Sequence, residues 1–256
     1  MMFKLYLIGF IPLLVIAVIT WMLSLWKQDV SIVDSVWSVF FVAAAACFGM
    51  NLPFLGPRGI ILFILLGLWA VRLSAFITWR NWGHPEDTRY QVIRHNNEPN
   101  FAWKSLYLVF ILQAILAWIV SAPLLVILAS PMPLQWSDYL GIVLMLFGLG
   151  FESLADWQLA HFKAKPNNKG LVMDGGLWRY TRHPNYFGEF CVWWGFFLMA
   201  IASGVWATII SPLLMSYLLI KVSGVPMLEK DIVQRRPTYR DYVTRTPSFF
   251  PGRPKN

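Results

Sequence analysis

Residues 182–189 concentrate ionisable and hydrogen-bonding side chains directly before an apolar segment. The run reads Arg182-His183-Pro184-Asn185-Tyr186-Phe187-Gly188-Glu189. A helix starting near Pro184 would place these groups at its N-terminus, where free backbone N–H groups and the helix dipole favour an anion. The run therefore predicts a site for a phosphate-bearing cofactor at a membrane surface.

An interfacial anchor is the alternative interpretation of the same run. Arg, His and Tyr at the end of a membrane helix often lie among lipid headgroups, which would account for Arg182, His183 and Tyr186. Glu189 fits this interpretation poorly, because it lies about one helical turn inside an apolar run. A carboxylate at that depth is costly unless it is paired or functional.

Four further charged residues fall inside apolar segments. Asp34 lies near the start of one segment and Arg72 lies inside the next. Glu152 and Asp156 are spaced i and i+4, so they share one helix face. Charges within lipid usually face a cavity or another charge, so we expect Arg72 to pair with Asp34 or Glu152, in a structural or a catalytic role. Asp156 precedes Lys163 at the end of its segment, where it could accept hydrogen bonds from a polar ligand.

The elements that would position these residues are membrane helices. Of the 256 residues, 57% are hydrophobic, only 13% are charged and 14 are Trp, which is the composition of an integral membrane protein. Several apolar runs reach the roughly 17 to 25 residues that a helix needs to cross hydrocarbon, and the alternating pattern of a β-barrel is absent. Cys47 and Cys191 both lie in apolar runs, which predicts neither a disulfide framework nor a metal site.

We expect an all-α integral membrane protein with seven transmembrane helices in a single domain, residues 1–256. The first apolar run is too long for a signal peptide and lacks a cleavage site, so it is predicted to be retained. Only Ala202-Ser203-Gly204 separates the last two helices, which predicts a tight hairpin, with one long broken helix as the alternative. The predicted helices cover residues 3–26, 32–50, 58–79, 103–129, 138–161, 186–202 and 205–221.

The formal net charge of +8 is concentrated on one side of this arrangement. Seven spans would bring residues 80–104, 162–185 and 222–256 to the same side, and the opposite side offers only Lys4 and Arg58. The positive-inside rule then predicts an external N-terminus and a cytoplasmic C-terminus. Attraction to anionic lipid would explain a basic tail, whereas loops that mix bases with Asn, Tyr and acids would suit a polyanion that carries sugars. No nucleic-acid motif is present, so nucleic acid is not an expected partner.

Several of these motifs together carry a family resemblance. The segment from Glu152 to Glu189 resembles the C-terminal half of the steroid 5-alpha-reductase family, and nearly the whole chain resembles its bacterial branch of uncharacterised membrane proteins, the DUF1295 type. The first set of motifs is Glu152-x-x-x-Asp156, Lys163, Gly175-Gly176-Leu177-Trp178-Arg179-Tyr180 and the run 182–189. The branch features are Asp34 with Trp37, Pro85-Glu86-Asp87-x-Arg89-Tyr90, Gly224-Val225-Pro226-x-Leu228-Glu229, Tyr239-Arg240-x-Tyr242 and Phe249-Phe250-Pro251.

The resemblance implies NADPH at the cytoplasmic mouth of a seven-helix fold, in a bacterial inner membrane. A steroid-like or isoprenoid enone would enter from the bilayer, and membrane lipids would be the other partners of a monomer. Glu152 and Glu229 depart from the family pattern, which has Asn and Tyr near these positions. The residues expected at the cofactor are Arg80, Asn81, Arg89, Glu152, Asp156, Lys163, Tyr180, Arg182, His183, Asn185, Tyr186, Glu189, Lys221 and Glu229.

Two other functions remain open at this point. Membrane isoprenylcysteine and phospholipid methyltransferases share Arg-His-Pro-x-Tyr-x-Gly and bind S-adenosylmethionine, a cofactor without phosphate that would not need so many bases. The acid Glu189 after Gly188 favours the reductases, in which it contacts the nicotinamide end of the cofactor. A transporter or scaffold would also accommodate intramembrane acids, without tight nucleotide binding.

The expected chemistry is hydride transfer to the β carbon of an enone, while negative charge grows on the carbonyl oxygen. The steroid enzymes polarise that oxygen with a Gln-Glu pair in the second helix and a Tyr in the third. Here Gln28-Asp29 precedes the second helix, and the third contains no Tyr. The candidates for the catalytic donor are therefore Arg72, Tyr90 and Asp34 as a protonated acid.

Overall fold

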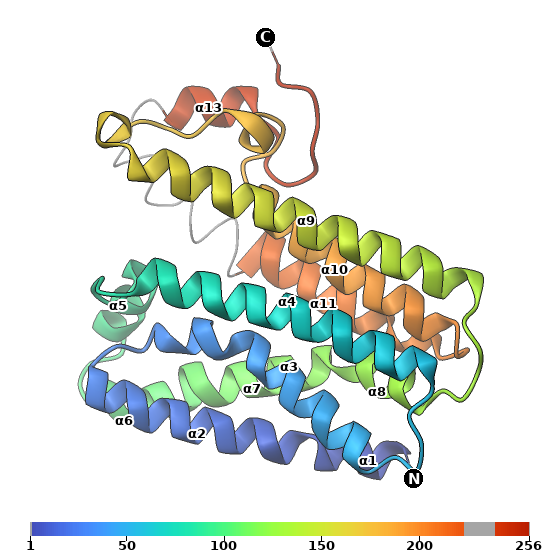
Figure 1. Ribbon diagram of the computed structural model, residues 1–256. Helices are drawn as coiled ribbons and strands as arrows, with labels where there is room; N and C mark the ends of the chain where they lie inside the picture. The colour runs from blue at the N-terminus through green and yellow to red at the C-terminus, as the bar shows by residue number, and fades with distance from the viewer. Residues whose placement is uncertain (1, 223–238, 256) are drawn as a thin grey trace. The chain divides into compact units, whose positions relative to one another are not determined.

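The computed structural model describes residues 2–222 and 239–255, and over these ranges the chain forms helices and loops without a strand. It packs as two compact units, which we call unit 1 (Met1–Gln135 with Ala200–Thr208) and unit 2 (Trp136–Met199 with Ile209–Asn256). All seven segments predicted to be helical from their apolar length are helical, as Figure 1 shows along the colour gradient. The all-α class is therefore confirmed.

Unit 1 contains the first four predicted helices and one that the sequence did not predict. The helix predicted at 103–129 is continuous in direction but contains a π-helical stretch, and the additional helix is α5. The elements are α1 (Met2–Ile8), α2 (Phe10–Lys27), α3 (Ile32–Met50), α4 (Pro57–Asn81), α5 (Thr88–Asn96), α6 (Phe101–Ser105), η1 (Leu106–Ile111), α7 (Leu112–Val120) and α8 (Ala122–Ala129).

Local side-chain chemistry explains why α5 forms in a stretch that looked like a loop. The Asp87 side chain accepts a hydrogen bond from the Arg89 backbone N–H at 2.9 Å, so it caps the helix N-terminus. Arg94 and His95 occupy the last turn, where positive charge complements the helix dipole. The helix is short and polar, so apolar periodicity could not reveal it.

Aromatic side chains form much of the core of unit 1. Phe40, Phe41 and Phe48 of α3 and Trp69 of α4 are completely buried, and the rings of Phe41 and Trp69 meet edge to face at 5.6 Å. α3 also packs against α2, α7 and α8. Gly9 separates α1 from α2, and a Cβ there would lie 2.1 Å from Cε1 of Phe48.

Arg58 is not the surface charge that the sequence suggested. Its side chain is completely buried at the start of α4. Nη1 donates to Ser130 Oγ at 2.5 Å and to Ser203 Oγ at 3.1 Å, and Nη2 donates to the carbonyl of Pro133 at 3.1 Å. Arg58 therefore joins three segments of unit 1, because a buried guanidinium is stable only when its donors are satisfied.

Unit 2 is built on two long helices and the segments that follow them. α10 and α11 form the predicted hairpin, because Trp194 Nε1 donates to Ser216 Oγ at 3.3 Å and a turn at Gly204, with φ +79°, separates the two helices. The elements that follow α8 are α9 (Trp136–Ala164), η2 (Pro166–Asn168), η3 (Gly176–Arg179), α10 (Pro184–Ile201), η4 (Trp206–Ile209), α11 (Ile210–Tyr217), η5 (Leu218–Val222) and α13 (Tyr239–Arg245).

Two glycine pairs bring the backbones of α9 and α10 into contact. A Cβ at Gly148 would lie 2.5 Å from the carbonyl oxygen of Gly188, and a Cβ at Gly195 would lie 2.7 Å from that of Gly141. Each helix places its two glycines seven residues apart, so both pairs fall on one face in an antiparallel crossing. Small residues are the usual means of close helix approach within membranes.

Five helical segments among the described residues are long and apolar enough to cross a membrane, which fits a multi-pass membrane protein. The hairpin helix α10 is not among them, and the segment Trp206–Val222 is apolar but shorter. The seven spans and the orientation of the termini therefore remain predictions. The five segments are Met2–Lys27, Ile32–Met50, Pro57–Asn81, Phe101–Ala129 and Trp136–Ala164.

The glycine contacts predict that Gly195→Ala destabilises the protein. The added methyl group would overlap the Gly141 carbonyl oxygen, so the helices must separate, at a cost of about 1–3 kcal/mol. Gly150→Ala on α9, the partner helix in this crossing, is the control, because a Cβ there meets no atom within 4 Å. Thermal unfolding in detergent measures both, and an unchanged midpoint for Gly195→Ala would contradict the assigned crossing.

Candidate functional site

Each unit holds its own cluster of buried or half-buried polar side chains. In unit 1, the cluster joins the first turn of α3 to α5. Asp34 Oδ1 accepts a hydrogen bond from the Tyr90 hydroxyl at 2.5 Å, and Asp34 Oδ2 accepts one from Arg89 Nη2 at 2.8 Å. Both carboxylate oxygens are therefore bound by donors from consecutive residues of α5. We call this group, with Asp87 and Gln113, the Asp34–Tyr90 cluster.

Asp87 and Gln113 complete the cluster from two sides. Asp87 accepts from Arg89 through both oxygens, at 3.0 Å from Nε to Oδ1 and 3.1 Å from Nη2 to Oδ2. Gln113 Nε2, from α7, donates to the Tyr90 hydroxyl oxygen at 3.2 Å. The phenol thus donates to a carboxylate and accepts from an amide, which fixes the direction of its proton.

The environment keeps Tyr90 neutral and Arg89 charged. Burial raises the pKa of Tyr90 well above its usual value, and the negative charge of Asp34 raises it further. Burial alone would lower the pKa of Arg89, but Asp34 and Asp87 outweigh it, and the net shift is upward. The pKa of Asp87 is lowered overall, because the hydrogen bonds and charge of Arg89 outweigh the opposing effect of burial.

This geometry changes the roles expected for Asp34 and Arg72. Both oxygens of Asp34 accept hydrogen bonds, one from a guanidinium and one from a phenol, whereas the sequence suggested Asp34 as a donor. Arg89, not Arg72, is the guanidinium that pairs with Asp34. Arg72 lies on α4, with Cζ 5.5 Å from the centroid of the Phe76 ring. Among the three candidate donors, Tyr90 is the one held by Asp34.

A second ion pair holds the loop before α3 against α5. Glu86 Oε1 accepts from the Val30 backbone N–H and from Arg94 Nη2, both at 2.8 Å, and Oε2 accepts from Arg94 Nε at 3.0 Å. Asp29 Oδ1 accepts from the backbone N–H of Ser31 at 2.8 Å. The prediction that Asp29 precedes the helix is therefore confirmed, and this acid organises the loop.

In unit 2, the close crossing of α9 and α10 brings together acids that are far apart in sequence. Asn185 Nδ2 donates to Asp156 Oδ1 at 3.1 Å, and a Cβ at Gly188 would lie 2.6 Å from the Glu152 Cβ. Glu189 is buried and its Oε1 accepts from Trp193 Nε1 at 3.0 Å. We call Glu152, Asp156, Asn185 and Glu189 the α9–α10 polar group.

The run before α10 is not a headgroup anchor. α10 begins at Pro184, as the sequence suggested, but Arg182 and His183 are buried. Arg182 Nη1 donates to the carbonyls of Val243 at 3.0 Å and Thr246 at 2.7 Å. This donor is therefore directed to the protein's own backbone, whereas the sequence assigned Arg182 to the cofactor.

The C-terminal segment closes over the loop that leads into α10. The Tyr242 hydroxyl donates to the carbonyl of Trp178 at 2.5 Å, and Thr181 Oγ1 donates to that of Phe249 at 2.8 Å. The backbone N–H of Gly252 donates to the carbonyl of Tyr180 at 2.9 Å. These three hydrogen bonds, one from an aromatic side chain and two through the backbone of the C-terminal segment, hold the loop of unit 2.

The remaining predicted cofactor residues are dispersed. His183 and Tyr186 stack with ring centroids 5.6 Å apart, and Tyr180 is 46% exposed. Arg80 Nε donates to Asn81 Oδ1 at 3.1 Å on unit 1. Arg89 belongs to the Asp34–Tyr90 cluster in unit 1, where its guanidinium donates hydrogen bonds to Asp34 and Asp87. Lys163 and Lys221 are exposed in unit 2, and Glu229 lies outside the described residues.

Sequence reasoning missed several residues on which these clusters depend. Gln113 is an isolated polar residue in an apolar helix, and that isolation was the available signal. Trp193 was indistinguishable from a lipid-facing aromatic residue until Glu189 was seen beside it. Gly141 and Gly148 share a seven-residue spacing that a search for close helix packing would have found. Asp87 and Glu86 lay in a recognised motif but had no assigned partners.

Comparison with known proteins identifies a family but no activity. A family model described as "Protein of unknown function (DUF1295)" matches residues 20–246, which spans parts of both units. The chain belongs to this family. An uncharacterized protein of Schizosaccharomyces pombe is 24% identical to this chain, over 96% of this chain and 79% of the yeast protein. No solved structure matches.

The buried phenol predicts a distinctive alkaline titration. Because its pKa is raised, Tyr90 should stay protonated in the folded protein near pH 10, where exposed phenols ionise. Its contribution to stability is intact below about pH 10 and is lost at higher pH, since the unfolded chain ionises first. Absorbance at 295 nm should show the same tyrosinate amplitude for folded wild type and Tyr90→Phe up to about pH 11.

The unfolded protein supplies the control for this titration. In denaturant all nine tyrosines are exposed, so Tyr90→Phe should remove the amplitude of one tyrosine. An equal loss of amplitude in the folded protein would mean that Tyr90 titrates as an exposed phenol, and the burial assigned to it would be wrong.

Proposed function

We propose that this DUF1295 protein is an NADPH-dependent membrane reductase of a carbon–carbon double bond conjugated to a ketone, in a steroid-like or isoprenoid lipid. The observation that carries the proposal is the Asp34–Tyr90 hydrogen bond of 2.5 Å. An acid and a Tyr are the groups that the resembled steroid reductases use to polarise a ketone. Here the Tyr comes from α5, which explains why the third helix contains none.

The residues of unit 2 fit a dinucleotide with a phosphate group. Asp156 and Asn185 offer an acceptor and an amide to ribose hydroxyls or the nicotinamide amide, and Glu189 adds a second buried acid. Lys163, Lys165 and Lys169 are exposed around the end of α9, where they could neutralise phosphates. Glu152, Tyr180 and Tyr186 are the other predicted contacts on this unit.

NADPH, when bound, supplies a hydride to the β carbon of the enone. Charge that develops on the carbonyl oxygen needs a donor, and Tyr90 is a neutral phenol at physiological pH because its pKa is raised. Asp34 and Gln113 hold that hydroxyl in place, and Arg89 holds Asp34 through its second oxygen. Because a phenol has only one proton to donate, the Tyr90 hydroxyl would exchange its hydrogen bond to Asp34 for one to the ketone oxygen when the substrate binds. A proton from solvent then adds to the α carbon to complete the saturated ketone.

The membrane arrangement belongs to the same proposal. Adding α10 and Trp206–Val222 to the five long apolar helices gives seven spans. The excess of Lys and Arg in the loops that would then share one side supports a cytoplasmic C-terminus and an external N-terminus. The buried position of Arg58 strengthens this bias, because it removes one of two bases counted on the opposite side. We propose a monomer in a bacterial inner membrane, with the cofactor facing the cytoplasm.

S-adenosylmethionine-dependent methyl transfer to a lipid or a prenylated thiol is the second candidate. Arg182 favours it, because a base expected to bind phosphate instead donates to the carbonyls of Val243 and Thr246. A cofactor without phosphate would not need that base. Glu189 and the Asp34–Tyr90 cluster favour the reductase, since methyl transfer requires no group to stabilise an enolate oxygen.

Cofactor binding separates the two candidates. At 100 times its dissociation constant, a ligand stabilises the folded protein by about 2.7 kcal/mol. We expect NADPH, but not S-adenosylmethionine, to raise the unfolding midpoint of the purified protein, and Asn185→Ala to abolish the rise. Asn51→Ala in unit 1 is the control and should keep it. A rise of the midpoint with S-adenosylmethionine alone would indicate that the protein is a methyltransferase. No rise with either cofactor would favour a transporter or scaffold over an enzyme.

Turnover of enones by the purified protein tests the assigned donor. Tyr90→Phe should lower kcat by about 100-fold or more, which is typical for loss of one positioned donor, while the NADPH-induced stabilisation is kept. Tyr107→Phe is the matched control, since that residue is 56% exposed on η1. Full turnover in Tyr90→Phe would exclude the phenol as the polarising group.

A further inference from the structure

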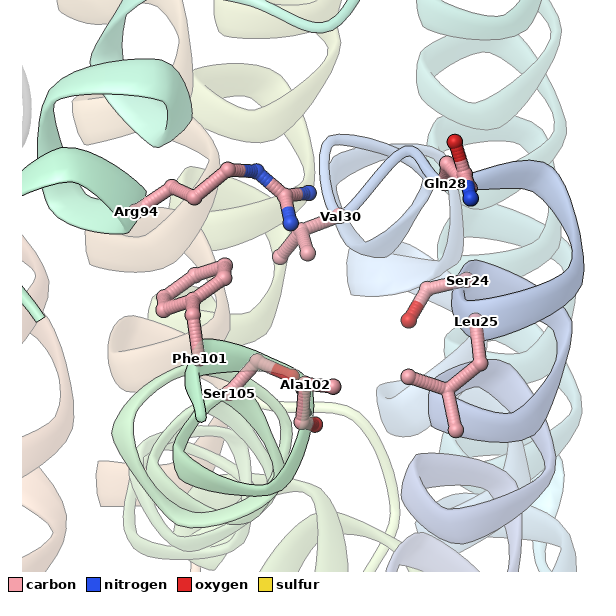
Figure 2. Close-up of a pocket in the computed structure, with 8 residues that line it drawn as sticks. All are labelled: Ser24, Leu25, Gln28, Val30, Arg94, Phe101, Ala102 and Ser105. Atoms are coloured by element: carbon pink, nitrogen blue, oxygen red, sulfur yellow. Dashed lines mark hydrogen bonds between the residues drawn. The ribbon is translucent and has the colours of Figure 1, made fainter. Parts of the chain in front are cut away.

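Unit 1 contains a cavity of about 380 Å³ that the proposed reaction does not use, although Gln28 of the Gln28-Asp29 pair lies on its wall. It lies between the C-terminal turn of α2, the loop before α3, α5 and α6, as Figure 2 shows. Its polar lining consists of Ser24, Gln28, Arg94 and Ser105, and Val30 and Phe101 add apolar surface. We call it the Arg94 cavity.

Arg94 directs a donor into this space. Nε and Nη2 bind Glu86, whereas Nη1 has no protein partner within residues 2–222 and 239–255. Figure 2 shows the guanidinium extending over the open centre of the cavity. The Phe101 ring lies below it, with its centroid 4.7 Å from Cζ. The ion pair thus fixes the guanidinium, and its remaining N–H groups are placed to donate to an acceptor oxygen in the cavity.

The two serines on the cavity wall provide acceptors. Ser24 Oγ donates to the carbonyl of Trp21 at 2.7 Å, and Ser105 Oγ donates to that of Ala102 at 2.8 Å. Both hydroxyl protons are therefore used within their own helices, and the oxygen lone pairs remain for a hydroxyl donor. A complementary ligand carries an acceptor oxygen for Arg94 and a hydroxyl group for a serine.

The charges around the cavity disfavour an anion. The hydrogen bond and charge of Glu86 raise the pKa of Arg94, and Glu98 and Asp29 contribute in the same direction. Glu86 already pairs with the guanidinium through both of its oxygens, which offsets the attraction that an unpaired Arg would exert on a phosphate. A ligand group that is complementary to this cavity is therefore uncharged.

The rim of the cavity has the character of a membrane interface. Leu25, Trp26 and Trp103 are 39%, 80% and 68% exposed, and Trp side chains gather at the boundary between hydrocarbon and headgroups. The cavity volume lies near the lower end of the roughly 300–1,000 Å³ of ligand pockets. It has room for the polar head of a lipid, while the chains would lie along the exposed apolar side chains.

We propose that the Arg94 cavity binds the uncharged head of a neutral lipid, one that carries both a hydroxyl group and a carbonyl oxygen, as diacylglycerol does. Arg94 Nη1 donates to the carbonyl oxygen, and Ser24 or Ser105 accepts from the hydroxyl. The proposal does not depend on the reductase reaction, because none of the lining residues belongs to the Asp34–Tyr90 cluster.

A diacylglycerol probe with a photoreactive diazirine near the glycerol tests this site on the purified full-length protein. Mass spectrometry should locate the label in residues 24–30 or 94–105. Ala102→Leu fills the cavity without touching the Arg94–Glu86 pair and should lower labelling about tenfold, as should Arg94→Gln through the lost charged hydrogen bond. Gly67→Leu is the control and should label as wild type, because a Cβ there meets no atom within 4 Å.

Competition identifies the chemistry of the head. Excess unlabelled diacylglycerol should suppress labelling, whereas phosphatidylglycerol and phosphatidylcholine at the same concentration should suppress it several-fold less. Stronger competition by either phospholipid would overturn the proposal in favour of a charged head. Unchanged labelling in a folded Ala102→Leu protein would overturn it as well, since the lipid would then lie outside the cavity.

Discussion

The ion pair between Asp34 and Arg89 is the interaction on which the organisation of unit 1 depends. A charge near the hydrocarbon must be paired, and here the partner comes from a short helix that forms only because Asp87 caps it and binds the same guanidinium. The pair fixes Arg89, and with it the adjacent Tyr90, at the start of α3. A structural requirement for charge neutrality therefore also positions a phenol whose proton has a defined direction.

In unit 2, polar side chains are brought together by close backbone contact between two helices. The glycines of α9 and α10 remove side chains from the crossing, so Asp156 meets Asn185 and Glu152 lies against Gly188. Closer helices mean that polar groups are shielded from lipid and can satisfy one another. The C-terminal segment adds hydrogen bonds to the loop before α10, which explains why Arg182 and His183 are buried despite their polarity.

Much of the fold could be predicted from the sequence, and much less of the site. Apolar length located seven helical segments because the hydrophobic signal of a membrane helix is local and strong. Asp34 and Glu189 could also be singled out, because ionisable residues are rare in such segments. The partners were harder to predict: Arg72 was expected to pair with Asp34 or Glu152, and it is Arg89 that pairs with Asp34. Pairing depends on contacts between distant segments, which periodicity does not report.

The sequence by itself determined the all-α membrane class of the protein, the positions of its apolar helices and the charged residues that interrupt those helices. Only the tertiary structure decided which of those residues meet, since Arg89 reaches Asp34 through a helix with almost no hydrophobic signature. It also decided that Arg58 is buried and that Arg94 retains a donor facing a cavity. The physical reason is that composition sets where a segment is stable, whereas hydrogen-bond geometry sets what each polar atom can still bind.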